Sequence, residues 1–258
     1  MAKVIDVISF NGEYDLWDIR YSILKDTIDE FIIVEAPTTF SGNPKPLYFE
    51  KIKDKYDRVK YFVIDENYTP EEIALAENSP NTIGGAKHFV HEFLQKESIK
   101  KALTHLKDDD LCFIGDADEI PETRYTGHED GGVVKLKLRV SAYYLNNRSD
   151  EAFWGTLKGF YGGIKNECLN HLRTNAVRTH GYYGWHFTNM GGLEEVRRKL
   201  NDSYTAESYN TAEVQEKLKE RFEQNKDYIG RGFVFTTDES DLPQYLKNNK
   251  QKYARLFK

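Results

Sequence analysis

The chain has 258 residues and a net charge of −6, and its length suits one sizeable domain. The acidic balance disfavours nucleic-acid binding, which relies on many Lys and Arg contacts to phosphates, and two cysteines are too few for a disulfide scaffold or a cysteine-rich zinc module. No apolar stretch approaches the ~20 residues of a membrane span, and Asp6 follows the start too closely for a signal peptide. We therefore expect a soluble, cytoplasmic protein with no membrane span and no nucleic-acid partner.

Strand and helix patterns alternate through the first half of the chain. Residues 14–24 carry apolar side chains at helical spacing, and residues 86–107 give the clearest helix. The segment 66–84, which contains Pro70 and Pro80, is predicted to be a loop with at most a short helical turn. Short apolar runs predict four strands, at 3–10, 31–35, 59–64 and 111–114. This order predicts an α/β fold with right-handed βαβ units and a mostly parallel central sheet flanked by helices.

The second half has a less regular pattern. Residues 134–140 alternate strictly, with an apolar face and a cationic face formed by Lys135, Lys137 and Arg139. That cationic face could meet a diphosphate or a glycan, but an exposed sheet edge is the commoner arrangement. The remaining segments are a glycine-rich and aromatic-rich stretch, a charged stretch with helical spacing and a last amphipathic helix, at 150–192, 193–224 and 243–258.

An acidic cluster directly follows the apolar strand at 111–114. Asp116, Asp118 and Glu119 place three carboxylates in four residues, and these repel one another unless a cation or an Arg or Lys partner compensates them. In extended backbone, positions i and i+2 point to the same side, so Asp116 and Asp118 can share one cation. Hard oxygen ligands suit Mg²⁺ or Mn²⁺, and ligands of such sheets bind beyond the carboxyl ends of the strands. A solvated acidic turn is the alternative.

Two further segments carry side chains that could contribute to a site. His186 lies beside Trp185 in a glycine-rich stretch that offers close backbone approach and a stacking face, with a packed Trp–His pair in the core as the alternative. His91, Gln95 and Lys96 share a helix face, which by itself indicates a solvated surface. The sequence has no H-E-x-x-H, P-loop, G-x-S-x-G or strand-following G-x-G-x-x-G motif, which disfavours zinc-hydrolase, P-loop, serine-hydrolase and dinucleotide sites.

These motifs, taken in order along the chain, resemble those of glycosyltransferase family 17, the β-1,4-mannosyl-glycoprotein 4-β-N-acetylglucosaminyltransferases. Each short piece is weak by itself, whereas the ordered set over nearly the whole chain is fairly specific. Lys96 stands where the family pattern has Arg. The matching pieces are 6–13 with Leu16 to Arg20, the loop from Glu35 to Lys45, the Gln95–Lys96 pair, the D-x-D-E-I-P run at 116–121, Gly184 to His186, and Leu242 to Leu246.

The resemblance implies a GT-A-type, Rossmann-like single domain over 1–258, with a nucleotide-sugar-binding half at 1–125 and an acceptor half with C-terminal helices at 126–258. It also implies Mn²⁺ or Mg²⁺, a nucleotide-sugar donor (UDP-GlcNAc above others) and a glycan acceptor. Asp118 would hold the metal, with Asp116 nearer the ribose or a water, and His186 would complete the metal shell or contact the diphosphate. The expected donor contacts are Phe10, Asn11, Glu13, Glu35, Lys45, Lys96, Asp116 and Trp185.

The implied reaction inverts the sugar linkage and therefore needs a general base on the acceptor side. The candidates are Glu119, Asp150 and Glu151, and Glu151 is favoured because it lies near Trp154, an aromatic that could stack on a sugar. Three alternatives remain open: a sugar-phosphate nucleotidyltransferase, a non-catalytic glycan-binding module, and a degenerate member that binds the donor without turnover. The first usually carries a basic, glycine-rich phosphate loop, whereas 9–13 is acidic; the second does not require the acidic cluster.

Overall fold

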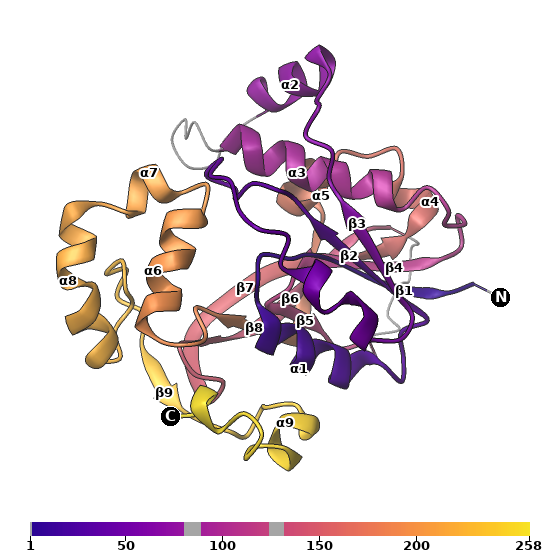
Figure 1. The fold of residues 1–258 in the computed structure, drawn as a ribbon. Coiled ribbons are helices and arrows are strands. Elements are labelled where there is room, and N and C mark those ends of the chain that lie inside the picture. The colour runs from indigo at the N-terminus through magenta and orange to yellow at the C-terminus, as the bar shows by residue number, and fades with distance from the viewer. Residues whose placement is uncertain (1, 80–88, 124–131) are drawn as a thin grey trace.

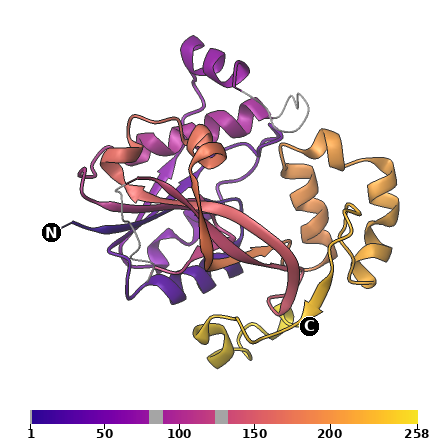
Figure 2. The same ribbon diagram turned by 180° about the vertical axis from the view of Figure 1, so that it is seen from behind.

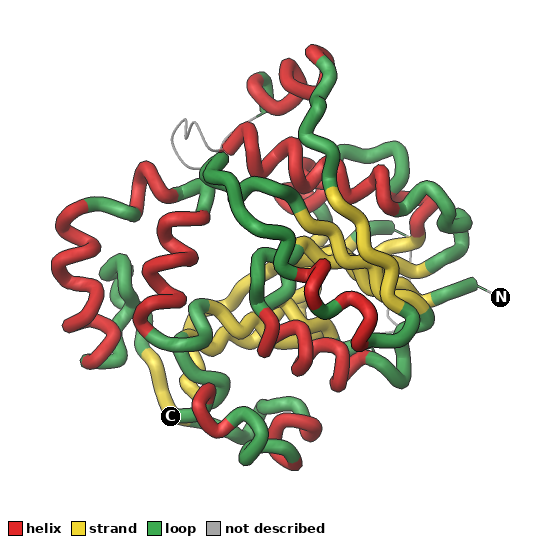
Figure 3. The backbone as a smooth tube through the Cα atoms, viewed as in Figure 1, coloured by secondary structure: helices red, strands yellow, loops and turns green. Residues whose placement is uncertain are grey.

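The computed structural model describes residues 2–79, 89–123 and 132–258. Within these ranges the strands form one sheet with the spatial order β3-β2-β1-β4-β7-β6-β8-β5, and β9 pairs with β7. Figure 3 shows these strands in yellow, with the helices in red around them. Helices cover both faces of this sheet (Figure 1). The strands are β1 (Val4–Ser9), β2 (Glu30–Glu35), β3 (Val59–Val63), β4 (Leu111–Asp116), β5 (Glu119–Pro121), β6 (Val134–Ala142), β7 (Asn147–Phe160), β8 (Val177–Thr188) and β9 (Phe235–Thr237).

In the first half, helices follow β1 and β3 and 3₁₀ turns follow β2, whereas the later helices gather beside the sheet. Figure 2 shows α6, α7 and α8 as a group at one side of the molecule, next to β9. The helices are α1 (Tyr14–Leu24), α2 (Pro70–Glu77), α3 (Phe89–Ala102), α4 (Tyr161–Ile164), α5 (Leu169–Asn175), α6 (Leu193–Asp202), α7 (Ala206–Tyr209), α8 (Ala212–Glu223) and α9 (Gln244–Asn248), with 3₁₀ turns at Phe49–Lys51, Lys53–Lys55 and Ala254–Leu256.

The first four strands in the spatial order are parallel, as the alternation of strands and helices predicts. β2 pairs with β1 and β3, and β4 pairs with the other side of β1. Every β2 residue is buried, and so are the interior residues of β1 and β4, which explains their continuous apolar character. The carboxyl ends of β1, β2 and β4 therefore meet at one edge of the sheet. The α/β class predicted from the sequence is confirmed.

The second half of the chain extends this sheet through longer strands. β7 pairs antiparallel with β4 and β6, and β8 pairs parallel with β6, so β6 lies inside the sheet. The expectation of an exposed edge at 134–140 is therefore wrong. Lys135 is 3% exposed and donates to the carbonyls of Arg173 and Thr174 at 2.8 and 2.7 Å. The Lys137 ammonium lies 4.4 Å from the centroid of the Tyr182 ring. These cations thus find carbonyl and aromatic partners within the fold.

The hydrophobic core occupies both faces of the sheet. On one face, α1 buries Trp17 and Ile19 against β1 and β4, and the C-terminal segment adds Leu246 and Leu256. On the other face, α3 packs against the same strands together with α4 and α5, and Ile99 is 3% exposed there. Within the described ranges, no helix has the length and apolar character needed to cross a membrane.

The segment after β3 is more ordered than its sequence suggests. Residues 70–77 form α2, two helical turns in place of the predicted loop with at most one short turn. Thr69 accepts from the backbone N–H of Glu72 while the Glu72 side chain accepts from that of Thr69, and Pro70 takes the first helical position. The capping box and Pro70 start α2, so Pro70 begins a helix here and does not interrupt one. Residues 80–84 lie outside the described ranges.

Other helical predictions hold with changed boundaries. The helix expected over 86–107 is α3, which ends at Ala102; residues 86–88 lie outside the described ranges. The pattern at 193–224 divides into α6, α7 and α8. The tail helix expected over 243–258 is split into α9 and a 3₁₀ turn. The Asn249 side chain donates to the Tyr245 carbonyl at 2.8 Å, and such local side-chain bonds compete with helix continuation.

Candidate functional site

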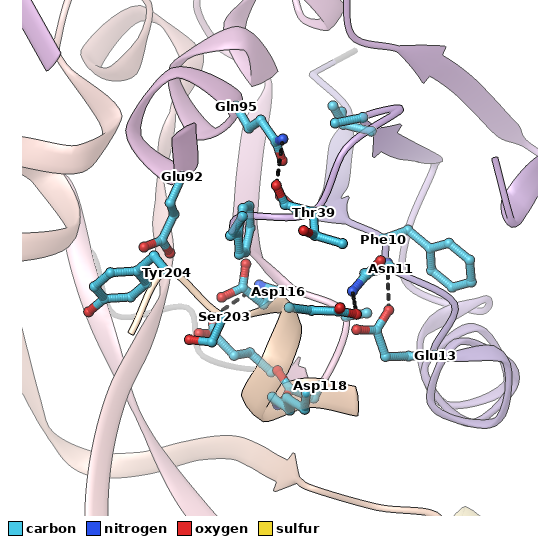
Figure 4. Close-up of a pocket in the computed structure, with 18 of the residues that line it drawn as sticks. Phe10, Asn11, Glu13, Thr39, Glu92, Gln95, Asp116, Asp118, Ser203 and Tyr204 are labelled. Carbon is cyan, nitrogen blue, oxygen red and sulfur yellow. Dashed lines mark hydrogen bonds and ion pairs between the residues drawn. The ribbon is translucent and has the colours of Figure 1, made fainter. Parts of the chain in front are cut away.

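A cavity of about 280 Å³ lies at the edge where the carboxyl ends of β1, β2 and β4 meet (Figure 4). Ligands of parallel α/β sheets bind at this edge. Phe10 follows β1, Thr39 follows β2 and Asp116 ends β4, so successive strand ends build the wall. His186 on β8 and Tyr204, just after α6, complete it. The topology therefore brings the acidic cluster and the β1 and β2 loops to one place, as the sequence predicts.

A buried arginine holds the acidic turn that follows β4. Arg20 on α1 is 0% exposed, and its Nε and Nη2 donate to the two oxygens of Asp6 at 2.7 and 2.6 Å. Its Nη1 donates to the backbone carbonyls of Asp116 and Glu119 at 3.1 and 2.7 Å. A planar guanidinium with five donors suits such a multiple contact. α1 and β1 thereby set the backbone path of residues 116–119.

Two cations from other elements flank Asp116. Lys96 Nζ on α3 donates to both carboxylate oxygens at 3.1 Å, and Arg173 Nη2 on α5 lies 3.3 Å from Oδ2. Arg173 also donates to Glu119 Oε1 at 2.9 Å. Burial alone would raise the pKa of Asp116, but the charges of Lys96 and Arg173 outweigh it and hold the pKa below its usual value. Lys and Arg partners thus supply the compensation that this cluster needs.

Asp118 lies where the acidic turn meets β8 and α6. Its carboxylate accepts a hydrogen bond from Lys199 Nζ, and His186 Nε2 lies 3.5 Å from Oδ2. The backbone N–H of Phe187 donates to the Asp118 carbonyl at 2.9 Å, which ties the turn to β8. Burial alone would raise the pKa of Asp118, but Lys199 and His186 outweigh it and hold the pKa well below its usual value. Asp118 is therefore ionised at neutral pH and can bind a cation.

The side chains around Asp118 fit a divalent cation with few protein ligands. Among the described residues, no three His, Cys, Asp or Glu side chains gather into a preformed metal site, and Asp116 is engaged by Lys96 and Arg173. Asp118 and His186 do adjoin, and within the described part of the chain the buried Nδ1 of His186 has no hydrogen-bond partner. Mg²⁺ and related ions keep waters and substrate phosphates in their coordination shell. Asp118 with His186 therefore suits such an ion where the ion shares or displaces the Lys199 contact, with Asp116 adjacent.

The residues that follow β1 line the cavity and contact α6. Phe10 is 3% exposed and packs edge-on against Phe49, with 5.2 Å between ring centroids. The Asn11 backbone N–H donates to Glu13 Oε2 at 2.7 Å, and the Asn11 side chain donates to Asp202 Oδ2 at 3.1 Å (Figure 4). Burial is the largest cause that raises the pKa of Glu13. The end of β1 and the last residue of α6 are thus joined beside the cavity.

Glu35 lies outside the cavity and organises the loop that follows β2. It is 1% exposed, and its carboxylate accepts from Lys45 Nζ at 2.9 Å and from the backbone N–H groups of Tyr48 and Phe49 at 2.7 and 2.9 Å. The Tyr61 hydroxyl donates to it at 2.8 Å. Lys45 itself lines the cavity. Glu35, expected among the donor contacts, therefore positions Lys45.

Trp185 and Lys96 also stand behind the cavity wall. Trp185 is 8% exposed in the core, and its indole Nε1 donates to the Asp241 carbonyl at 2.6 Å. Lys96 contacts the cavity wall through Asp116 and through Glu92, whose Oε1 lies 3.2 Å from the Lys96 Nζ. Gln95 and Lys96 are each 5% exposed, so the solvated helix face predicted for them is wrong. The Gln95 amide donates to the Thr38 carbonyl and hydroxyl at 3.2 and 3.0 Å, which anchors the loop after β2 to α3.

The three candidate bases differ in their surroundings. Glu119 lines the cavity, yet it is 1% exposed and ion-paired with Arg173. Asp150 lies on β7 outside the cavity, where its carboxylate accepts from the Val234 backbone N–H at 3.2 Å. Glu151 is half-buried on the same strand, and burial is the largest cause that raises its pKa.

The charge of His186 connects Glu151 with the cavity. His186 is among the groups that lower the pKa of Glu151 against the effect of burial, so the two side chains lie close together. Phe153 lines the cavity, and its ring lies against His186 with 4.2 Å between centroids and 30° between planes. The Asp150 carboxylate instead binds the Val234 backbone N–H. Of the two neighbouring carboxylates on β7, Glu151 is therefore the one beside His186.

Several residues of the site carry no local signal in the sequence. Arg173 and Lys199 bind Asp116 and Asp118, and Ser203 and Tyr204 line the cavity from the turn after α6. The acidic cluster indicates that cations must compensate it, but the chain has 36 Lys and Arg residues from which to choose. Only the tertiary structure shows which of these Lys and Arg residues pair with the acidic cluster.

Comparison with known proteins relates the chain to one enzyme family. A family model described as glycosyltransferase family 17 matches residues 1–201. β-1,4-Mannosyl-glycoprotein 4-β-N-acetylglucosaminyltransferases of Rattus norvegicus and Homo sapiens are each 31% identical over 174 residues, and that of Mus musculus is 30% identical. The matched stretch is 60% of this chain and 29% of the length of each relative.

Solved structures give more distant likenesses. An active-site mutant of LgtC matches with a TM-score of 0.36 and 11% identity, over 64% of this chain and 61% of that chain. The CTP:phosphocholine cytidylyltransferase LicC of Streptococcus pneumoniae matches with a TM-score of 0.35 and 13% identity, over 76% of this chain and 96% of that chain. Likenesses at these TM-scores are too distant to bear on the function.

Proposed function

Because the chain belongs to glycosyltransferase family 17, we propose that it is a metal-dependent, inverting glycosyltransferase of the GT-A type. In this proposal N-acetylglucosamine moves from UDP-GlcNAc to a hydroxyl of a glycan acceptor. The choice of sugar follows the name of the relatives, which describes 4-β-N-acetylglucosamine transfer to a β-1,4-mannosyl glycoprotein. The match covers under a third of those relatives' length. Their mannosyl acceptor is therefore used here only as a test compound for acceptor binding.

One observation carries the proposal: the acidic pair lies in a cavity at the carboxyl edge of the parallel strands. Asp116 ends β4 and Asp118 follows it, beside the ends of β1 and β2. Asn11 and the Thr38–Thr39 loop line the cavity with amide groups and hydroxyls that suit a nucleoside. A nucleotide bound with its diphosphate toward Asp118 would lie at the carboxyl edge of the parallel strands, with the diphosphate next to the carboxylate that would hold a metal ion.

The charges around the site suit a diphosphate leaving group. Asp118 and His186 would hold Mn²⁺ or Mg²⁺, which supplies Lewis-acid stabilisation of the negative charge that grows on the diphosphate. Lys45 and Lys199 line the same cavity, with the Lys199 ammonium paired to Asp118 and the Lys45 ammonium held by Glu35. Arg20, Lys96 and Arg173 hold the acidic turn in one geometry, so these groups need no rearrangement when charge develops.

Inversion requires one displacement at the anomeric carbon. The acceptor oxygen forms the new bond as the bond from that carbon to the diphosphate oxygen breaks, and the bonding electron pair leaves with the diphosphate. The acceptor proton passes to a carboxylate. We assign this role to Glu151, which lies beside His186, because Glu119 is committed to Arg173 and Asp150 to the Val234 backbone N–H.

The test is binding and transfer with a matched pair of variants. In wild type, UDP-GlcNAc with Mn²⁺ should raise the melting temperature, because a ligand of the folded state stabilises it. Asp118→Asn should lose the metal-dependent part of this shift and lower transfer by about a hundredfold or more, as losing one electrostatic group at a transition state does. Asp109→Asn, an exposed carboxylate before β4, is the control. A wild type that binds no UDP-sugar at saturating Mn²⁺ overturns the proposal.

A further inference from the structure

A second cavity, of about 400 Å³, adjoins the first. The two share Glu13, Asp118 and Lys199 in their walls. The rest of the second cavity comes from the first turn of α1, the turn after β8, the start of α6 and Arg255 near the C-terminus. Segments from both ends of the chain therefore meet beside the acidic turn. Two cavities with Asp118 between them suit two substrates that react with each other.

We propose that the second cavity binds the acceptor saccharide; this inference rests on the proposed function. Transfer in one displacement needs the acceptor hydroxyl in contact with the anomeric carbon, which is attached to the diphosphate. An acceptor site must therefore adjoin the donor cavity beside the residue that faces the diphosphate. The second cavity does so at Asp118.

Aromatic side chains give this cavity a surface for a sugar ring. Tyr14 and Tyr48 meet edge to face with 6.4 Å between ring centroids, and the Tyr14 hydroxyl donates to the Tyr48 carbonyl at 3.1 Å. Tyr14 is 38% exposed, so part of the ring remains open to a ligand. Sugars stack their C–H faces on such rings, which supply contact area with little loss of side-chain freedom.

The charged groups of the cavity favour a neutral saccharide over a second phosphate. Its walls carry four carboxylates and three cations, which are Glu13, Asp15, Asp118 and Glu195, and Arg198, Lys199 and Arg255. Arg255 is paired with Asp15, and Arg198 Nε donates to Glu195 Oε2 at 2.8 Å. Adjacent donors and acceptors of this kind match the neighbouring hydroxyls of a sugar. An anionic ligand would meet more carboxylates than cations.

The turn after β8 is shaped to close this cavity. Asn189 has φ 57° and Gly191 has φ 98°, and Asn189 is 7% exposed. A Cβ on Gly191 would lie 2.9 Å from Glu195 Cγ, so glycine lets the turn pass close to α6. Left-handed conformations at a buried asparagine are costly and persist where the surroundings impose them, often at ligand sites. The turn joins the strand of His186 to the helix of Lys199.

The experiment compares two neighbouring glutamates on the first turn of α6. Glu195→Ala removes a carboxylate of the cavity, whereas Glu194→Ala removes one that is 79% exposed outside it; each pairs with an arginine three residues later. Tyr14→Ala tests the aromatic wall, and Tyr182→Ala, on the cation-bearing face of the sheet, is its control. The probes are methyl β-mannoside as acceptor, followed by saturation-transfer NMR and by KM in the transfer assay, and UDP with Mn²⁺ as donor ligand, followed by calorimetry.

Glu195→Ala and Tyr14→Ala should each raise the acceptor KM or Kd about tenfold, the effect of losing one good contact, while the UDP affinity stays within about twofold. Glu194→Ala and Tyr182→Ala should bind both ligands as wild type does. An unchanged acceptor affinity in both cavity variants overturns the inference, as does an equal loss of UDP affinity, which would assign the cavity to the donor. Failure of wild type to bind UDP overturns the proposed function instead, and the NMR measurement still tests the saccharide site.

Discussion

Asp116, Asp118 and Glu119 keep their charges at close quarters because each binds cations from distant parts of the chain. Lys96 and Arg173 form ion pairs with Asp116, and Arg173 also pairs with Glu119. Asp118 pairs with Lys199, whose ammonium has the Thr188 hydroxyl 3.2 Å away as a second partner. Asp118 is buried while the Lys199 side chain is 44% exposed, so losing Lys199 would leave a buried charge without this partner. The Asp118–Lys199 pair is therefore the contact that any cation at Asp118 must share or displace.

Two neighbouring carboxylates on β7 allow a direct test of the base. Glu151→Gln should lower kcat by about 10²- to 10⁴-fold, the usual contribution of a positioned general base, with UDP affinity unchanged because Glu151 lies outside the donor cavity. Asp150→Asn should keep most of the activity, since its carboxylate serves a backbone N–H of the 234 segment. Single-turnover transfer assays measure the chemical step. Equal losses in the two variants would contradict the assignment.

At the scale of elements, one arginine connects α1, β1 and the acidic turn. Arg20 occupies the face of α1 that packs on the sheet, and its guanidinium spans from Asp6 on β1 to the carbonyls of Asp116 and Glu119. Both members of the Arg20–Asp6 pair are fully buried. Such a pair adds little net stability relative to apolar residues, but breaking it is costly. The Arg20–Asp6 pair therefore matters more for the position of the acidic turn than for the stability of the fold.

A single and a double variant separate stability from positioning. Arg20→Met leaves Asp6 charged and buried without its partner, and should lower the free energy of unfolding by about 3–5 kcal/mol in urea melts. Asp6→Leu with Arg20→Met removes both charges and should regain much of that stability. The double variant should still transfer sugar poorly, because it lacks the guanidinium that bridges the Asp116 and Glu119 carbonyls, and the Thr156 hydroxyl, at 3.1 Å, donates to the Glu119 carbonyl alone. Full activity in the double variant would show that the turn needs no such anchor.

Elements with strong local patterns are predictable from this sequence, and contacts between elements are not. The apolar runs that become β1, β2 and β4 and the acidic residues directly after β4 are visible in the sequence, so the edge that carries the site is visible too. The interior position of β6 depends on pairing with β7 and β8, which alternation alone does not encode. Arg173 and Lys199 reach the site through tertiary packing of α5 and α6, and no spacing rule marks them.

At the scale of the whole molecule, the carboxyl and amino ends of the parallel strands carry different groups of charged residues. The carboxyl edge gathers the carboxylates and cations of the site, whereas the amino edge carries an ion-pair cluster that joins consecutive segments. Glu30, at the start of β2, accepts from Lys3 at 3.2 Å, Lys60 at 3.0 Å and His105 at 2.6 Å. These partners precede β1, lie on β3 and follow α3. One carboxylate thus joins much of the parallel half of the sheet.

This cluster predicts how stability depends on pH. Burial alone would raise the pKa of Glu30, but hydrogen bonds from Lys60, His105 and Lys3 outweigh it and hold the pKa below its usual value. A carboxylate with a depressed folded pKa contributes stability above its unfolded pKa of about 4.3 and loses it as pH falls through the folded value. Glu30→Gln should therefore be less stable than wild type at pH 7, and the gap should narrow between about pH 5 and pH 3. Urea melts across this range measure it; a gap that stays constant would show that the Glu30 charge contributes nothing, because only a titrating group can make the difference depend on pH.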